Sequence, residues 1–159
     1  MKKIIMLAGI GGTGKSYYAK NLNLPGLVKI VSSDEIRYSI TKSYSIILDN
    51  MMIVYDKMIE TCNELIKENE DITVILDSTF LNDQRRNYFI DHLKNYDELE
   101  LHMLKVHDEK IIYERNKKRM KEKWIPEDVI ASMIKKYSYP SKENISKYTL
   151  IKEVYVDEK

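Results

Sequence analysis

Five short apolar runs alternate with longer segments in which apolar residues recur at helical spacing. The runs are mostly β-branched, as is typical of buried strands, and lie at residues 4–8, 28–31, 72–76, 99–106 and 150–156. Helical patterns fill the intervals at residues 15–21, 34–40, 47–68, 83–95, 108–121 and 127–137. This alternation predicts an α/β fold: a mainly parallel sheet of about five strands with helices on both faces. Ligands of such sheets bind at the carboxyl ends of the strands.

Composition narrows the classes of protein to consider. A chain of 159 residues fits one domain, which we expect to span residues 1–159. Lys and Arg number 26 against 25 Asp and Glu, and the net charge of +1 argues against bulk electrostatic coating of nucleic acid or membrane. The single cysteine, Cys62, excludes an internal disulfide and fits a cytoplasmic location. No apolar run approaches the length of a membrane span, so we expect no membrane partner. The sequence leaves open whether the protein forms a homo-oligomer.

Four of the five glycines lie between Gly9 and Gly14, in the segment Gly-Ile-Gly-Gly-Thr-Gly-Lys-Ser at residues 9–16. This segment matches G-x-x-x-x-G-K-[ST], the phosphate-binding loop (P-loop), between a predicted strand and a predicted helix. The alternative is a glycine turn followed by an incidental Lys-Ser pair. As a P-loop it predicts ATP bound with Mg²⁺, the metal held by the Ser16 hydroxyl. Residues expected to contact the nucleotide are Gly11, Gly12, Thr13, Gly14, Lys15, Ser16 and Tyr17.

Asp34 directly follows the second predicted strand, and Arg37 lies one helical turn later. A carboxylate at a strand end is suited to accept the proton of an attacking hydroxyl. An acceptor that is already a phosphate needs no such base, so Asp34 favours a hydroxyl kinase. Arg37 could hold an anionic group of the acceptor. Alternatively, Asp34 or Ser33 caps the helix and Arg37 is a surface residue.

The third predicted strand ends in Asp77, an arrangement like the Walker B motif. Its carboxylate could serve the metal or seat the acceptor, with Ser78 and Thr79 sharing that role, or it could simply cap a helix. Arg85, in the following helix, could contact the acceptor or remain solvated.

Residues 110–123 contain seven Lys or Arg and two Glu, a local charge of +5. Arg115 and Arg119 are four residues apart, which predicts that both guanidinium groups lie on one helical face. We expect a lid at about residues 110–124 that stabilises the transferring phosphoryl group. The alternative is a solvated basic helix.

These motifs, in this order, resemble the kinase module of polynucleotide 5′-hydroxyl kinases, the family of phage polynucleotide kinase and the kinase domains of bacterial RNA-repair enzymes. The resemblance extends to about Tyr139 and implies a P-loop NTPase/kinase fold. It also implies that Lys15 and Ser16 bind ATP with Mg²⁺ and that Asp34 is the general base.

The same resemblance implies that Arg37 grips a phosphate of the acceptor and that Arg119, supported by Arg115, stabilises the transferring group. The acceptor would be a 5′-hydroxyl end of DNA or RNA. Phe80 departs from the pattern, because an Asn is common there. The strand-end acid shifts by one residue among such kinases, which leaves open whether Asp77 or Ser78 contacts the metal or the acceptor. Two rival readings are a small-molecule hydroxyl kinase, acting on a nucleoside, sugar or antibiotic, and an NTP-binding regulatory module.

Overall fold

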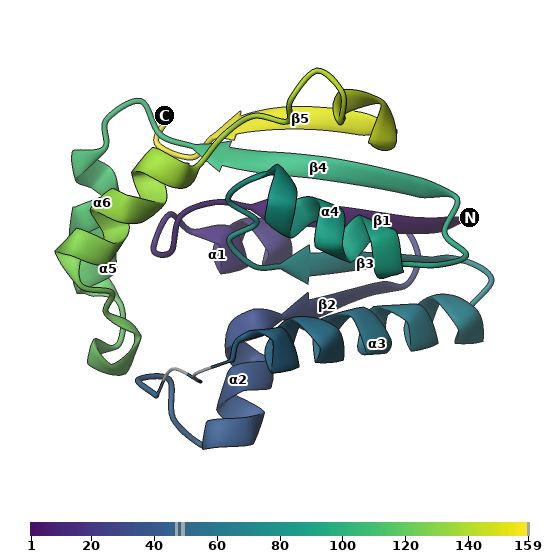
Figure 1. The fold of residues 1–159 in the computed structure, drawn as a ribbon, viewed down its shortest axis with the longest axis horizontal. Coiled ribbons are helices and arrows are strands. Elements are labelled where there is room, and N and C mark those ends of the chain that lie inside the picture. The colour runs from purple at the N-terminus through teal and green to yellow at the C-terminus, as the bar shows by residue number, and fades with distance from the viewer. Residues whose placement is uncertain (47, 49, 159) are drawn as a thin grey trace.

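A parallel sheet of five strands organises the molecule (Figure 1). The computed structural model describes residues 1–46, 48 and 50–158. The strands lie in the order β2-β3-β1-β4-β5, so that the first strand of the chain is the central one. Their bounds are Lys2–Ala8 for β1, Val28–Ser32 for β2, Ile72–Asp77 for β3, Glu98–Lys105 for β4 and Leu150–Tyr155 for β5. The predicted α/β fold class is confirmed.

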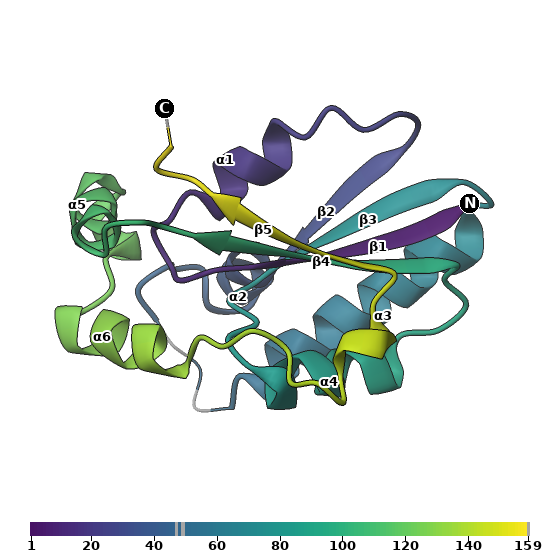
Figure 2. The same cartoon turned by 90° about the horizontal axis from the view of Figure 1, so that it is seen from above.

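In the residues that the structure describes, six α-helices connect or flank these strands. One of them, α1, covers one face of the sheet, α3 and α4 cover the other, and α2, α5 and α6 gather at the carboxyl ends of the strands (Figure 2). The helices are α1 Lys15–Lys20, α2 Ser33–Thr41, α3 Met52–Glu68, α4 Asp83–His92, α5 Lys110–Lys118 and α6 Glu127–Lys136, with 3₁₀ turns η1 at Lys121–Lys123 and η2 at Ile145–Lys147.

Alternation along the strands divides the core between the two faces. Ile4 and Met6 of β1 belong to the large apolar cluster under α3 and α4, whereas Ile5 and Leu7 belong to the smaller cluster under α1. A third cluster, centred on Ile10, joins the P-loop to α5 and α6. The lid is therefore packed against the loop that the sequence assigns to phosphate.

The strand register brings polar residues to one edge. Ser32, which ends β2, is opposite Asp77, which ends β3, and Asp77 is in turn opposite Leu7 of β1. The P-loop leaves β1 one residue later. The carboxyl ends of β1, β2 and β3 thus form a shared floor, as expected for a ligand site in a parallel sheet.

Two predicted helix boundaries are wrong, and one cannot be compared. The helix predicted at 108–121 ends at Lys118, because Arg119 is extended with φ −74° and ψ 162°. The helix predicted at 83–95 ends at His92, before Asn95 takes a left-handed φ of 64°. The start predicted at residue 47 lies outside the described residues, and α3 begins at Met52. Across the described residues, no helix is long and apolar enough to cross a membrane.

Candidate active site

The P-loop forms an open cradle of backbone groups between β1 and α1. Gly12 and Gly14 have left-handed φ values of 89° and 103°, which side chains rarely adopt. The loop is braced from within by the Thr13 hydroxyl, which donates to the Ile10 carbonyl at 2.8 Å. The segment after β3 holds its start, because the Thr79 carbonyl accepts from Gly9 N–H at 3.0 Å. Gly14 caps α1 without a side-chain hydrogen bond, so the first N–H groups of that helix are left to a ligand.

Lys15, Ser16 and Asp77 meet at the floor of this cradle. The Ser16 hydroxyl donates to Asp77 Oδ2 at 3.2 Å. Burial lowers the pKa of the Lys15 ammonium, against the opposing negative charges of Asp77 and Asp34. Burial likewise raises the pKa of the Asp77 carboxyl, and Lys15 and Ser16 oppose that shift. An ammonium and a carboxylate that are both penalised by desolvation favour a highly charged ligand between them.

The predicted metal ligands fit a magnesium ion. Ser16 and Asp77 supply a hydroxyl and a carboxylate oxygen side by side, and Mg²⁺ is commonly bound by one or two such groups together with nucleotide phosphates and water. In the part of the chain that the structure describes, no group of three or more His, Cys, Asp or Glu side chains could hold a metal ion. A metal here would depend on the nucleotide.

Asp34 lies in the first turn of α2 and does not cap that helix. The helix cap is Ser32, whose hydroxyl accepts from Glu35 N–H at 3.4 Å, so the alternative in which Asp34 or Ser33 caps the helix is wrong. Asp34 instead lies between two arginines: Oδ1 is 3.5 Å from Nη2 of Arg37, and Oδ2 is 3.7 Å from Nη2 of Arg119. Its side chain is 44 % exposed, so the carboxylate remains accessible from the cleft.

Both arginines keep donors without a partner. Arg37 Nη2 donates to the Tyr44 carbonyl at 3.0 Å, while its Nε is buried and unbonded within the described part of the chain. Arg119 Nη1 is buried and unbonded in the same sense. Burial lowers the pKa of Arg119, Asp34 opposes that shift, and the neighbouring charge of Arg37 adds to it. Two guanidinium groups with unused N–H donors therefore flank one carboxylate, which suits an anionic ligand.

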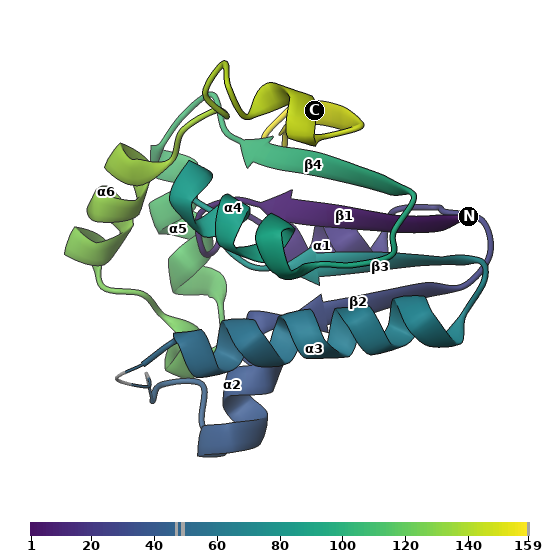
Figure 3. The same cartoon turned by 45° about the vertical axis from the view of Figure 1, so that its right-hand side comes forward.

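The sequence predicted that Arg115 and Arg119 lie on one helical face, but Arg119 lies beyond the end of α5. Arg115 donates from Nη1 to the Thr13 carbonyl at 2.8 Å and from Nη2 to the Val156 carbonyl at 2.9 Å, tying the lid to the P-loop and to the end of β5. The helix ends before Arg119, although both arginines line the same cleft. Residues 110–124 consist of α5, η1 and the turn toward α6 (Figure 3), and their role as a lid stays a prediction.

The arginines after β3 lie outside the cleft. Arg85 stacks 4.2 Å from the centre of the Tyr55 ring, which lines the cleft, and donates to the Met52 sulfur; its contact with the acceptor stays a prediction. Arg86 is fully buried and donates to the carbonyls of Phe80 and Ser138. Phe80, at the position where the resemblance expects Asn, is itself fully buried at a φ of 43°.

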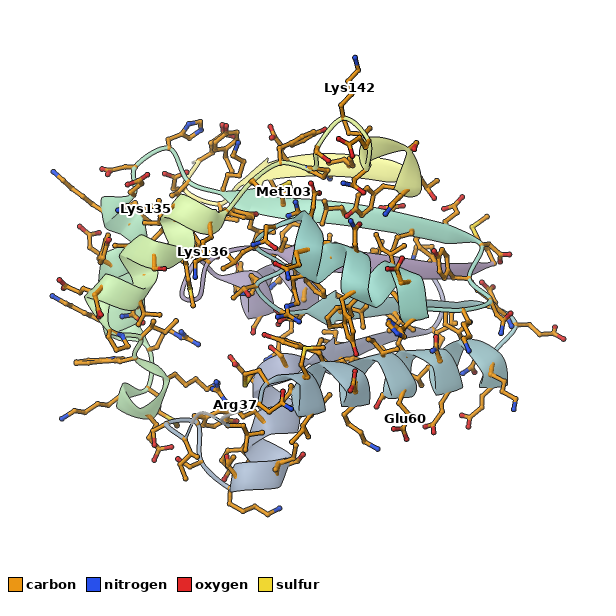
Figure 4. The ribbon with its side chains drawn as sticks, viewed as in Figure 1. Arg37, Glu60, Met103, Lys135, Lys136 and Lys142 are labelled. Atoms are coloured by element: carbon orange, nitrogen blue, oxygen red, sulfur yellow. The ribbon has the colours of Figure 1, made fainter. Side chains whose placement is uncertain are left out.

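One cleft of about 1270 Å³ is lined by the predicted site residues Gly11, Gly12, Gly14, Lys15, Ser16, Tyr17, Asp77, Ser78, Thr79 and Arg115, together with Asp34, Arg37 and Arg119. Thr13, also predicted to contact the nucleotide, is buried beneath this surface, and its N–H donates to the Ile10 carbonyl at 3.2 Å. Single-ligand sites usually measure about 300–1,000 Å³, so there is room for two ligands. Figure 4 shows Arg37 on α2 and, across the opening, α6 with Lys135 and Lys136. Several residues that line the cleft belong to no motif of the sequence and were not predicted: Tyr44, Met51, Tyr55, Trp124, Ile125, Val129 and Met133.

A parallel sheet with a P-loop after its central strand and a basic lid over it defines a P-loop domain of the kinase-like type, which implies nucleotide binding. The sequence model described as AAA domain matches residues 4–140, and the chain belongs to that family. No curated protein matches the sequence.

Solved structures support the fold. A chain of the Pnkp1/Rnl/Hen1 RNA repair complex aligns with a TM-score of 0.72 and 21 % identity over 91 % of this chain, which spans only 46 % of that chain. A gluconokinase from Sinorhizobium meliloti 1021 aligns at 0.61 and 16 %, covering 99 % and 85 %. Chaetomium thermophilum Kti12 in complex with ADP-AlF3 aligns at 0.67 and 14 %, covering 98 % and 90 %. At these identities the similarity establishes the fold alone.

Proposed function

We propose that the protein is an ATP-dependent kinase that transfers the γ-phosphoryl group to the 5′-hydroxyl end of DNA or RNA. The observation that carries the proposal is Asp34, an accessible carboxylate that lies between Arg37 and Arg119 and lines the same cleft as the P-loop. A hydroxyl acceptor needs a base at this point, and the unpartnered guanidinium N–H groups suit the phosphates of donor and acceptor.

In this mechanism the P-loop N–H groups and Lys15 hold the ATP phosphates. Ser16 and Asp77 would hold Mg²⁺, which neutralises charge on the β- and γ-phosphates when bound. Asp34 accepts the proton of the 5′-hydroxyl as its oxygen attacks the γ-phosphorus and ADP leaves. Arg119 donates to the transferring phosphoryl oxygens, and Arg37 binds the phosphate that follows the terminal nucleoside.

The wall of the cleft favours a nucleotide over a sugar as acceptor. Met51 and Tyr55 of the α3 side, and Val129 and Met133 of α6, line it with apolar surface. A sugar presents hydroxyl groups around its ring, and each would need a hydrogen-bond partner when buried. A nucleobase presents flat apolar faces that suit such a wall.

The rival functions also have support. The fold is shared with a gluconokinase and with Kti12, so a small-molecule kinase and an NTP-binding module stand as alternatives. The first would transfer the phosphoryl group to a small-molecule hydroxyl, and the second would bind ATP without transfer to any acceptor.

Transfer from labelled ATP tests the proposal. The acceptors are 5′-hydroxyl DNA, 5′-hydroxyl RNA, nucleoside 3′-monophosphates, unmodified nucleosides and gluconate, each with Mg²⁺. We expect transfer to the nucleic-acid ends and to nucleoside 3′-monophosphates, falling as salt rises because counterions compete for Arg37 and the basic lid. Transfer to gluconate or nucleosides alone, or ATP binding without transfer to any acceptor, would contradict it.

A further inference from the structure

One glycine of the P-loop, Gly11, is explained by its neighbour Ile125, whereas Gly12 is explained by its left-handed φ of 89°. The pattern G-x-x-x-x-G-K-[ST] requires neither Gly11 nor Gly12. A Cβ on Gly11 would lie 2.3 Å from Cδ1 of Ile125, and a Cβ on Gly12 would lie 3.4 Å from Cα of Asn116. A side chain at residue 11 would therefore displace the Ile125 side chain, whereas the space around Gly12 would accept a Cβ in ordinary contact with Asn116.

Asn116 joins those two contacts. It lies on α5, is 4 % exposed, and directs its side-chain amide at one residue. Nδ2 donates to the Ile125 carbonyl at 2.8 Å, and Oδ1 accepts from Ile125 N–H at 3.0 Å. Its own carbonyl accepts from Arg119 N–H at 3.3 Å. One residue thus fixes both ends of the segment 119–125.

That segment carries Arg119 outside any α-helix. Arg119 is extended, and the following residues form only the short turn η1. The indole N–H of Trp124 closes the segment by donating to the Arg119 carbonyl at 2.8 Å. Since no helical backbone holds Arg119, its placement depends on the Asn116 amide, on Trp124 and on the packing of Ile125 over Gly11.

We propose that Asn116 is a positioning residue: its amide bridge to Ile125 holds segment 119–125 against the P-loop, so that the Arg119 guanidinium is aimed at the transferring phosphoryl group. The inference rests on the proposed role of Arg119. A shift of about 1 Å at such a group is enough to lower a rate about 100-fold, so a side chain that never touches the substrate can have a large effect on kcat.

The chain offers a matched control for this bridge. Asn63 of α3 makes the same pair of bonds to backbone, donating to the His92 carbonyl at 3.0 Å and accepting from Lys94 N–H at 3.0 Å. It does not line the cleft. Asn63→Ala therefore reports what the loss of an amide bridge costs the fold alone.

The first experiment needs no acceptor. Trp124 is the single tryptophan and lines the cleft, so its emission can follow titration with ADP and Mg²⁺, with and without aluminium fluoride, a mimic of the transferring phosphoryl group. We expect wild type to bind ADP at least about 10-fold more tightly with aluminium fluoride. Asn116→Ala and the milder Asn116→Asp should lose most of that gain with little change in the affinity for ADP alone, and Asn63→Ala should keep it.

Equal gains in wild type and Asn116→Ala, or no gain in wild type, would overturn the proposal. Thermal unfolding of all three variants separates a fold defect from a positioning defect, because Asn116→Asp retains the side-chain volume and one of the two bonds. If wild type gains affinity from aluminium fluoride but phosphorylates no nucleic-acid end, the proposed function fails while the role of Asn116 stands.

The second experiment is a double-mutant cycle on transfer. Asn116→Ala should lower kcat about 10- to 100-fold and change KM for ATP less than about 3-fold, an expected split between chemistry and binding. In an Arg119→Ala background the same change should cost almost nothing more, because the group that it positions is absent. A full additional loss in that background would contradict the proposal and assign Asn116 a structural role.

Discussion

The donor half and the acceptor half of the cleft are held by different kinds of contact. The donor half, residues 9–16, is fixed by backbone hydrogen bonds, such as Gly9 N–H to the Thr79 carbonyl at 3.0 Å, and by Arg115 at 2.8 Å from the Thr13 carbonyl. The acceptor half is spanned by long ion pairs of 3.5 and 3.7 Å around Asp34 and by the ammonium of Lys123, 4.2 Å from the centre of the Tyr44 ring.

From this difference we expect a donor half that is preorganised and an acceptor half that rearranges on binding. Long ion pairs to a carboxylate that is 44 % exposed contribute little to stability. A phosphate can therefore replace Asp34 as the partner of Arg37 and Arg119 at small cost, and the displaced carboxylate becomes free to accept a proton. We therefore interpret the two ion pairs of Asp34 as contacts of the unliganded protein, which Arg37 and Arg119 exchange for phosphates in the proposed reaction.

Asp34→Asn tests the acceptor half most severely. The amide keeps the size of the side chain but cannot take the proton of the hydroxyl, so we expect transfer to fall about 10²–10⁴-fold. Binding of a 5′-hydroxyl oligonucleotide, measured by fluorescence anisotropy, should change little. Unimpaired transfer would leave the base unidentified and favour an acceptor that is itself a phosphate.

Lys15→Ala is the corresponding test of the donor half. Loss of the buried ammonium removes a positive charge from the β- and γ-phosphates, and we expect transfer to fall about 10²–10³-fold at saturating ATP and Mg²⁺. The fold should persist, as checked by circular dichroism and thermal unfolding, because the Lys15 ammonium is penalised by burial in the free protein. Near-wild-type transfer would contradict the proposed role of the P-loop in binding the phosphates of ATP.

Arg119→Ala should affect turnover more than nucleotide affinity. A guanidinium recruited to the transferring phosphoryl acts mainly in the transition state, so we expect kcat to fall about 10²-fold while the Kd for ATP changes far less. Steady-state kinetics and equilibrium binding on the same preparation separate the two quantities. Collapse of ATP affinity with unchanged kcat would make Arg119 a nucleotide-holding residue that belongs to the donor half.

Gly11→Ala probes the seam between the two halves and should have the smallest effect. Its φ lies outside the left-handed region, so an added Cβ costs little in the backbone and acts by displacing Ile125, 2.3 Å away. We expect kcat to fall about 10-fold. The compensating change Ile125→Ala should restore part of that loss in the double variant, and its failure to do so would mean that Gly11 serves the phosphates directly.

The sequence predicted the donor half well because its signal is local. The P-loop pattern, the strand before it and the helix after it lie within about one supersecondary unit, and the end of β3 at Asp77 follows from the same alternation. The fold class could be predicted for the same reason, since period-2 and period-3.6 patterns report buried faces directly.

The acceptor half and the lid were harder to predict because long-range contacts decide them. Residues 108–121 contain no helix-breaking residue, since the next proline is Pro126. The helix nevertheless ends at Lys118, and the Asn116 amide bonds Ile125 instead of leaving residues 119–125 helical. Arg115 looked like a partner of Arg119 because spacing carries no information on the carbonyls of Thr13 and Val156. Gly11 was the one local signal of a close neighbour, because the P-loop pattern does not require a glycine there and its φ is not left-handed.

The central claim, transfer to a 5′-hydroxyl beside a phosphate, is tested most directly by the Arg37→Ala variant. The measurement compares kcat/KM for a nucleoside 3′-monophosphate with kcat/KM for the same unmodified nucleoside, in wild type and in the variant. The account predicts that wild type prefers the 3′-phosphate and that Arg37→Ala loses about 10-fold or more on that acceptor alone, as expected for one charge-assisted hydrogen bond. Equal losses on both acceptors, or no preference in wild type, would contradict it.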